Sequence, residues 1–233
     1  MDNILKAEHI SREFAIGDGS TVKALTDIDL EINEGELVCL RGRSGSGKTT
    51  LINILGALDR PSGGNVFFCG NDMNAMTDAQ RDTLRRKELS FVFQSVALIS
   101  TMTALENVEF SLRLSGHPIQ GRIQRAKDCL TRVGLGKRMD HRPGELSGGE
   151  QQRVAIARAV AGGPKVIFAD EPTAALDTNT GTAVLALFRE LVHEDGITVV
   201  MTTHDEAMME LADIVYSLDD GRITDITRNN IPL

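Results

Sequence analysis

Aromatic residues and long apolar runs are scarce in this chain of 233 residues. Phe, Trp and Tyr together make up 4% of the sequence, and tryptophan is absent. No apolar run approaches the roughly 20 residues that a membrane-spanning helix needs. The first residues, Met1 to Ile4, lack the basic and apolar regions of a signal peptide. We therefore expect a cytosolic chain, in which any role at a membrane depends on a partner.

Cysteine and positive charge are also limited. The three cysteines, Cys39, Cys69 and Cys129, are far apart and show no zinc or redox spacing, so we expect buried or free thiols in a reducing compartment. The 33 acidic residues outnumber the 25 basic ones, and the net charge of -8 argues against a general nucleic-acid binder. Hydrophobic residues at 41% and charged residues at 25% are typical of a globular α/β protein.

The glycine-rich segment from Gly42 to Thr50 organises the rest of the chain. It follows the pattern GxxxxGK with Thr in the next position. The apolar run 37–40 before it predicts a buried strand, and apolar residues at helical spacing predict a helix after it. Those residues are Leu51, Ile52, Leu55 and Leu58. A glycine-rich turn that merely precedes a helix is the alternative, and the strand–loop–helix context disfavours it.

This loop has the chemistry of a polyphosphate site. Gly42, Gly45 and Gly47 allow backbone angles that point successive N–H groups at phosphate oxygens. The start of the helix adds free N–H donors and a partial positive charge. Lys48 can reach the β- and γ-phosphates, and the Thr49 hydroxyl can ligate Mg²⁺.

Residues 166–171, Val-Ile-Phe-Ala-Asp-Glu, predict a buried strand that ends in two adjacent carboxylates. Neighbouring side chains on a strand point in opposite directions, so Asp170 and Glu171 should have different roles. Asp170 suits the Mg²⁺ shell, and Glu171 suits polarising an attacking water. The alternative is a surface Asp-Glu pair ahead of a proline turn.

Three further places have both a functional and a structural interpretation. Ser147 and Glu150 have capping-box spacing, but the two glycines between them also permit an anion site at the helix start. Phe14 can stack on a base or belong to the core. His204 follows the strand predicted at 198–203 and can contact a γ-phosphate or lie on the surface.

The remaining pattern alternates strands and helices. Residues 4–40 predict short strands, and the charged helix 78–88 is expected to place Arg81, Arg85, Arg86 and Lys87 on a solvated face. Further strands are predicted at 65–69 and 89–93, helices from Thr103, over 120–133, from Glu150 and over 179–194, and a strand pair at 214–227 with a turn at Asp220-Gly221.

With these motifs in this order, the chain resembles the nucleotide-binding subunits of ABC transporters over essentially its whole length. The matching segments are Walker A at 42–50, the Q-loop at Gln94, the signature at 146–150, Walker B at 166–171, the D-loop at 175–177 and the switch residue His204. Within the family it most resembles the LolD, MacB and FtsE group, on the stretches 51–59, 91–94, 105–108 and 168–173.

The resemblance implies an α/β fold: a P-loop NTPase (RecA-like) core with an N-terminal antiparallel β subdomain and an inserted α-helical signature subdomain. It implies one ABC ATPase domain over 1–233, with the core at about 1–93 and 163–233 and the helical subdomain at about 95–162.

The resemblance also implies the cofactors, ATP and Mg²⁺, and the residue roles. Glu171 would be the general base and His204 the γ-phosphate sensor, while Lys48 and Gln94 would also serve catalysis. Mg²⁺ would lie among Thr49, Gln94 and Asp170. The expected nucleotide contacts are Phe14, Gly42, Ser44, Gly45, Ser46, Gly47, Lys48, Thr49, Thr50, Ser147, Gly148, Gly149 and Asp177.

For partners, the resemblance implies a head-to-tail dimer with ATP between Walker A of one copy and the signature of the other. Membrane permease subunits would dock near residues 95–110, at the cytoplasmic face of the membrane, and no nucleic acid is expected. The preferred function is to energise an FtsX- or MacB-like permease for export or extraction of a lipid-linked, peptide or drug-like substrate. The alternatives are a conventional multi-span importer or exporter, and a soluble assembly factor or nucleotide-dependent scaffold.

Three positions depart from the family pattern. Phe14 stands where tyrosine is common, so stacking on adenine survives without the hydroxyl. Glu150 replaces the commoner glutamine and would place a carboxylate near the γ-phosphate, with an effect on turnover left open. Ser100 stands where this group often has proline, in the docking stretch.

Overall fold

The computed structural model describes residues 3–17, 19–203 and 205–229. Its first sheet is antiparallel, with the strand order β2-β1-β4-β5. Its strands are β1 (Asn3–Ala15), β2 (Thr21–Asn33), β4 (Gly63–Phe68) and β5 (Asn71–Asp72). The prediction of short strands was wrong for β1 and β2, which have 13 residues each. Register shifts interrupt their pairing, and His9 and Asp27 have positive φ, which breaks the alternation that a regular strand shows.

The second sheet has six strands in the order β10-β9-β3-β8-β7-β6. Its strands are β3 (Leu37–Arg41), β6 (Leu89–Val92), β7 (Val166–Asp170), β8 (Thr198–Thr203), β9 (Ile214–Asp219) and β10 (Arg222–Arg228). All neighbours are parallel except the hairpin β9–β10. Asp220 and Gly221 turn this hairpin with φ of 43° and 72°, which confirms the predicted Asp-Gly turn.

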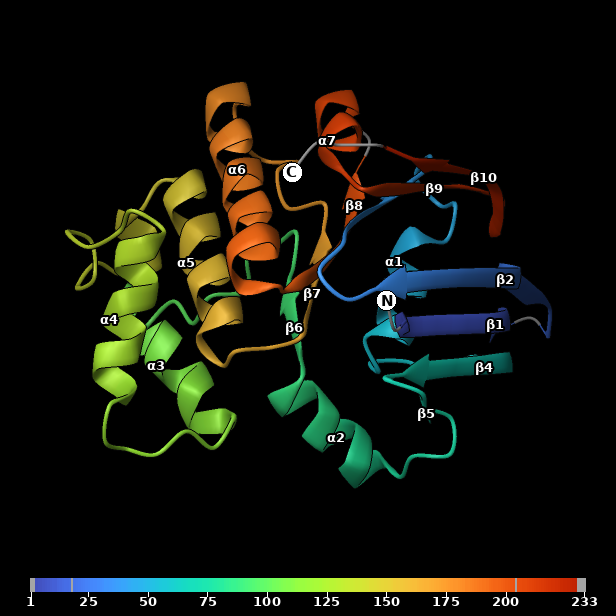
Figure 1. Cartoon of the computed structure of the whole chain (residues 1–233), viewed down its shortest axis with the longest axis horizontal. Coiled ribbons are helices and arrows are strands. Elements are labelled where there is room, and N and C mark those ends of the chain that lie inside the picture. The colour runs from blue at the N-terminus through green and yellow to red at the C-terminus, as the bar shows by residue number, and fades with distance from the viewer. Residues whose placement is uncertain (1–2, 18, 204, 230–233) are drawn as a thin grey trace.

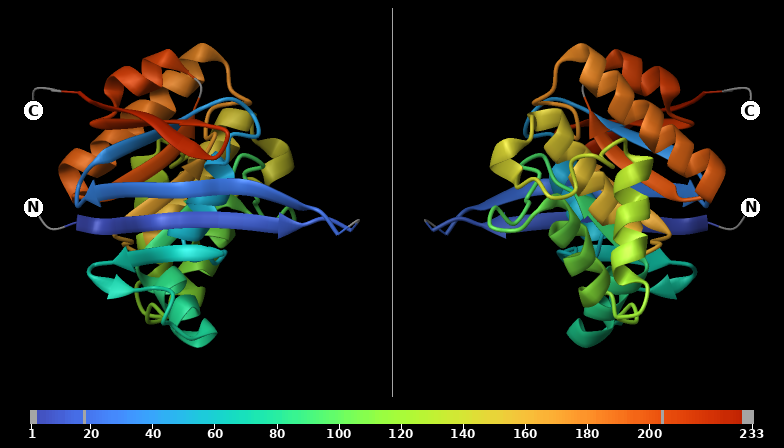
Figure 2. Two further views of the ribbon diagram at one scale, coloured as in Figure 1. Left: turned by 90° about the vertical axis from the view of Figure 1, so that its right-hand side faces the viewer. Right: turned by 90° about the vertical axis from the view of Figure 1, so that its left-hand side faces the viewer.

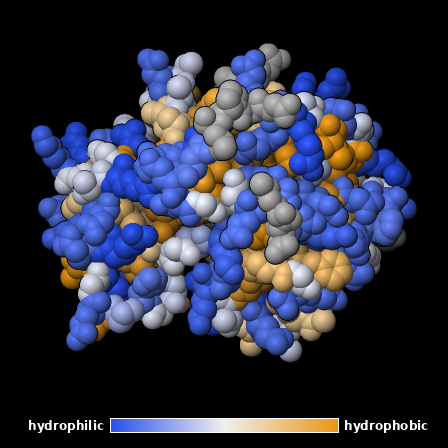
Figure 3. Space-filling view, viewed as in Figure 1, coloured by the Kyte–Doolittle hydropathy of each residue, from blue (hydrophilic) through white to orange (hydrophobic). Residues whose placement is uncertain are grey.

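The helices between residues 104 and 195 gather on one side of the six-stranded sheet, away from the antiparallel sheet, whereas the helix Lys48–Leu55 packs between the two sheets (Figures 1 and 2). The helices are α1 (Lys48–Leu55), α2 (Asp78–Lys87), α3 (Ala104–Leu114), α4 (Arg122–Arg132), α5 (Gly148–Ala161), α6 (Thr178–Asp195) and α7 (Glu206–Leu211), with a 3₁₀ turn at Pro143–Glu145. None of these helices is long and apolar enough to cross a membrane over the part of the chain described. In Figure 3, hydrophilic residues cover most of one face and hydrophobic ones form small separate groups.

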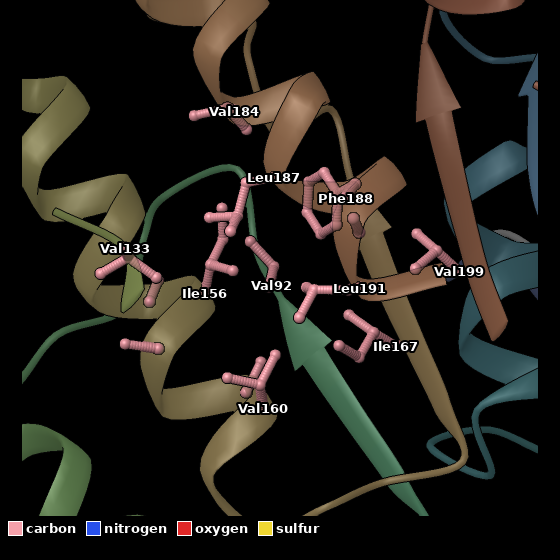
Figure 4. Close-up of a cluster of buried hydrophobic side chains, with 14 of the residues drawn as sticks. Val92, Val133, Ile156, Val160, Ile167, Val184, Leu187, Phe188, Leu191 and Val199 are labelled. Atoms are coloured by element: carbon pink, nitrogen blue, oxygen red, sulfur yellow. The ribbon is translucent and has the colours of Figure 1, made fainter. Parts of the chain in front are cut away.

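The core consists of two apolar clusters, one on each face of the six-stranded sheet. Alternate residues of β3 join different clusters: Leu37 and Cys39 join one, and Val38 and Leu40 join the other. Figure 4 shows the helical side, where residues of α5 and α6 meet Val92, Ile167 and Val199 of the strands. Because both faces are covered, the carboxyl ends of the parallel strands form the open edge at which α/β proteins bind ligands.

Two local expectations were wrong. Arg81 of α2 is 4% exposed and donates hydrogen bonds to the carbonyls of Met73 and Asp59, so it ties α2 to the fold and does not lie on a solvated face. Helix α1 ends at Leu55, so Leu58 lies beyond it with 46% of its surface exposed. Tertiary contacts decided the place of Arg81, whereas α1 ends locally, where Gly56 is its C-cap and Ala57 has a φ of 61°.

Candidate nucleotide-binding site

The P-loop connects β3 to α1, and two of its glycines are required by the fold itself. Gly47 is the N-cap of α1 with φ of 99°, and a Cβ there would lie 2.5 Å from the carbonyl oxygen of Ala24. A Cβ on Gly42 would lie 2.3 Å from the carbonyl oxygen of Leu218. Larger residues at either position would displace the loop from the neighbouring backbone.

Lys48 and Ser46 carry the polar groups of this loop. Lys48 is 7% exposed, and its Nζ donates to the carbonyl oxygens of Gly42 at 2.8 Å and Arg43 at 3.0 Å. The Ser46 hydroxyl is buried and has no hydrogen-bond partner within the described ranges. Helix α1 has no side-chain N-cap and no acidic residue in its first turn. The unpartnered Ser46 hydroxyl and the N–H groups at the uncapped start of α1 can donate to an anion such as phosphate.

The carboxylates of Asp170 and Glu171 lie opposite the loop and have different partners. The Thr49 hydroxyl donates to Asp170 Oδ2 at 3.0 Å. Gln94, just after β6, donates from Nε2 to Glu171 Oε2 at 3.3 Å. Strand β7 ends at Asp170, and Glu171 has φ of 45°. Thr49 and Asp170 offer oxygen ligands within reach of one hard cation, so these residues fit Mg²⁺.

Ser147 caps α5, and the predicted capping box is confirmed. The Glu150 N–H donates to the Ser147 hydroxyl at 3.3 Å, and the Ser147 N–H donates to Glu150 Oε2 at 2.9 Å. Arg138 donates to the same carboxylate at 3.2 Å. The Ser147 N–H, assisted by Arg138, holds the pKa of Glu150 below its usual value. The Glu150 carboxylate is thus hydrogen-bonded to the N-cap residue of its own helix and to Arg138.

The two signature glycines differ in their surroundings. A Cβ on Gly149 would lie 2.1 Å from Thr180 Cγ2 on α6, so packing within the chain requires glycine there. A Cβ on Gly148 would meet only Leu176, at 3.9 Å. Asp177 caps α6, accepting hydrogen bonds from the Thr180 N–H at 3.1 Å and hydroxyl at 2.6 Å, and these bonds lower its pKa. The start of α5, at the signature, and the start of α6, at the D-loop, are therefore in contact.

The other expected contacts are placed as follows. Phe14, at the end of β1, is 40% exposed, and the Arg12 guanidinium carbon lies 4.4 Å from its ring centroid. Ser44 and Gly45 lie on the exposed outer part of the loop, and Thr50 is half-buried in α1. His204 lies outside the described residues.

Two residues that the sequence did not single out also reach this region. Thr202, at the end of β8, contacts both Asp170 and Glu171. Arg158 of α5 donates to the carbonyls of Val96 and Ala97 in the loop after Gln94. A threonine in an apolar strand and an arginine within a helical stripe have no sequence signal, because their roles depend on contacts between distant segments.

A phosphate-binding loop at the carboxyl edge of a parallel sheet, facing an Asp-Glu pair, defines a P-loop nucleotide-binding protein. The family model described as "ABC transporter" matches residues 25–174, and the chain belongs to this family. The resemblance noted from the motifs and the predicted fold class are both confirmed.

The similar proteins described below each match 96–98% of this chain. An uncharacterized ABC transporter ATP-binding protein of Methanocaldococcus jannaschii is 45% identical over 223 residues, which is 96% of this chain and 99% of that protein. The macrolide export ATP-binding/permease protein MacB of Vibrio parahaemolyticus is 44% identical over 98% of this chain, which spans 35% of MacB. The dimeric ATP-binding cassette MJ0796, solved in a post-hydrolysis state with ADP and Pi, has a TM-score of 0.89 and 39% identity, covering 96% of this chain and 98% of that one.

The chain is therefore the ATP-binding, ATP-hydrolysing part of an ABC transporter. Its own residues offer groups of the kinds that such chemistry uses: N–H groups and a lysine at a glycine-rich loop, side-chain oxygens that could ligate a cation, and an adjacent second carboxylate.

Proposed function

We propose that this chain energises a permease of the FtsX or MacB type, for export or extraction of a lipid-linked, peptide or drug-like substrate. The observation that carries the proposal is the 44% identity to MacB over 98% of this chain, since MacB by its name joins such a cassette to a permease. The cassette would act at the cytoplasmic face of the membrane, attached through the permease.

The proposed hydrolysis site joins two copies of the chain head to tail. In one copy the P-loop and Lys48 hold the phosphates, Phe14 stacks on adenine, and Thr49, Gln94 and Asp170 surround Mg²⁺. Glu171 is the general base and His204 the γ-phosphate sensor. The other copy brings Ser147, Gly148, Gly149 and Asp177. Space above Gly148 supports the arrangement, because no residue in the described ranges comes closer than 3.9 Å to a Cβ placed there.

Residues 95–110 are the proposed docking surface for the permease. Asn107 is 1% exposed, and its side-chain amide bonds the backbone of Ile99, Met102 and Thr103. Arg158 fastens the preceding turn. A segment fixed to α3 and α5 in this way can transmit displacement between a partner and the signature helix. This supports the proposed division into a core and a helical subdomain at about 95–162.

Recovery of partners with the Glu171→Gln chain from native membranes tests the proposal. The substitution removes the base and should trap the ATP-bound dimer, so co-purifying proteins can be identified. A Glu171→Gln chain that also carries Lys48→Ala is the matched control, since it should not hold ATP. Recovery of a four-span permease with a large extracytoplasmic domain supports the proposal. A six-span or larger permease favours a conventional transporter, and a trapped dimer without any membrane protein favours a soluble scaffold.

A further inference from the structure

Thr202 joins the two carboxylate residues of the site through one hydroxyl. It lies in β8 directly opposite Asp170 of β7 and is fully buried, with 0% of its surface exposed. Its Oγ1 donates to Asp170 Oδ1 at 2.6 Å and accepts the Glu171 backbone N–H at 2.8 Å. One donor and one acceptor function of the hydroxyl are thereby used.

The bond to the Glu171 N–H matters because of the backbone there. Strand β7 ends at Asp170, and Glu171 has a φ of 45°, a region that residues with a Cβ rarely adopt. The Thr202 hydroxyl accepts the Glu171 N–H in place of a backbone carbonyl of the neighbouring strand. It therefore holds the turn that directs the Glu171 carboxylate away from Asp170 and toward Gln94.

The bond to Asp170 fixes the other carboxylate. Asp170 accepts from Thr49 through Oδ2 and from Thr202 through Oδ1, so its plane is held from two sides. Thr49 is exposed at the P-loop helix, where a cation would compete for its oxygen, whereas Thr202 lies beneath the site. Thr202 can keep Asp170 oriented whether or not a cation is bound.

We propose that Thr202 is a positioning residue for both the Mg²⁺ ligand Asp170 and the base Glu171. This inference rests on the proposed roles of those two residues. A buried threonine on the same strand shows the purely structural alternative: Thr198, also 0% exposed, accepts the Gly35 N–H at 2.9 Å at the far end of β8.

Three variants separate these possibilities. Thr202→Val removes the hydroxyl at almost constant volume, Thr202→Ser keeps it, and Thr198→Val loses a comparable buried hydrogen bond away from the site. For Thr202→Val we expect kcat to fall about tenfold or more with little change in KM, and Thr202→Ser to restore it to within about threefold. Thr198→Val should keep wild-type kcat.

Two readouts do not depend on turnover. Hydrogen exchange at the Glu171 amide should be about tenfold faster in Thr202→Val than in wild type. In Thr198→Val it should proceed at the wild-type rate. The gain in ATP affinity on adding Mg²⁺ to an EDTA-treated sample should shrink in Thr202→Val, while the affinity in EDTA stays at the wild-type value. Equal kcat and equal Mg²⁺ gain in Thr202→Val and wild type would overturn the inference, as would equal losses in Thr202→Val and Thr198→Val. A wild-type chain without Mg²⁺-dependent hydrolysis would instead refute the proposed function.

Discussion

At the scale of single residues, the Ser46 hydroxyl is unusual because it is buried without a hydrogen-bond partner among the residues described. Such a group costs folding about 1–3 kcal/mol, so its presence points to a ligand. We expect Ser46→Ala to leave the melting temperature unchanged or higher and to weaken ATP binding about five- to tenfold. Calorimetry with ATP and thermal unfolding of the free chain measure both. A lower melting temperature with unchanged affinity would assign the hydroxyl to the fold.

The Glu150 carboxylate accepts hydrogen bonds from Ser147 and Arg138. Its structural role in the cap can therefore be tested separately from any effect of its charge on the γ-phosphate. Glutamine can still accept the Ser147 N–H, so we expect Glu150→Gln to keep turnover within about twofold of wild type. A rise of about fivefold or more would show that the carboxylate restrains hydrolysis.

The difference in stability between wild type and Glu150→Gln should depend on pH. Because the folded-state pKa of Glu150 is depressed, the ionised carboxylate contributes stability above its unfolded value near 4.5, and this is lost as pH falls through the folded value. We expect wild type to melt about 1–3 °C above Glu150→Gln at pH 7, with the difference shrinking below pH 4.5. A difference that is constant with pH would refute any contribution of the ionised carboxylate, held by the Ser147 N–H and Arg138, to stability.

At the scale of elements, the turn after Gln94 depends on a distant helix. Val96 and Ala97 have φ of 61° and 48°, and Arg158 of α5 bonds both of their carbonyls. Lysine cannot form this two-pronged contact. We expect Arg158→Lys to speed amide exchange in residues 95–102 about tenfold while ATP affinity stays unchanged. The exposed Arg113→Lys on α3 is the control, and equal exchange in the two variants would show that the turn holds itself.

How well the elements could be predicted follows from where their signals lie. The start of α3 at Thr103 and the Asp220-Gly221 turn were predicted because a cap and a turn are encoded within four residues. The lengths of β1 and β2 were not, since the irregularities at His9 and Asp27 hide their alternation. The turn at Val96 had no local signal, because its unfavourable angles are held by a residue about 60 positions away in sequence.

At the scale of the whole molecule, the motif order predicts which residues share a site, because parallel strands bring their carboxyl ends to one edge. Thr49, Asp170 and Thr202 meet there from three separate segments. Their contacts could not be predicted from spacing. Nor could spacing show that Thr180 occupies the space next to Gly149, whereas the space next to Gly148 is open. That difference makes Gly148 the position at which a second copy can be tested.

Mixing two inactive variants distinguishes a shared site from a site within one chain. Lys48→Ala disables the P-loop. Gly148→Asp has room in the folded chain, and a carboxylate at a helix start is favourable, but it would repel phosphate brought by a partner. Each variant alone should be inactive. In a mixed dimer with a shared site, the intact P-loop of one copy faces the intact signature of the other.

An equal mixture should therefore regain about a quarter of wild-type turnover, because half of randomly formed dimers are mixed and each holds one intact site. The control mixes a chain carrying both substitutions with wild type, which leaves no complete site in the mixed dimer. If each site lay within one chain, the two single variants would stay inactive when mixed, and the control mixture would keep every wild-type site. Recovery in the first mixture together with loss in the second is a combination that only a shared site produces.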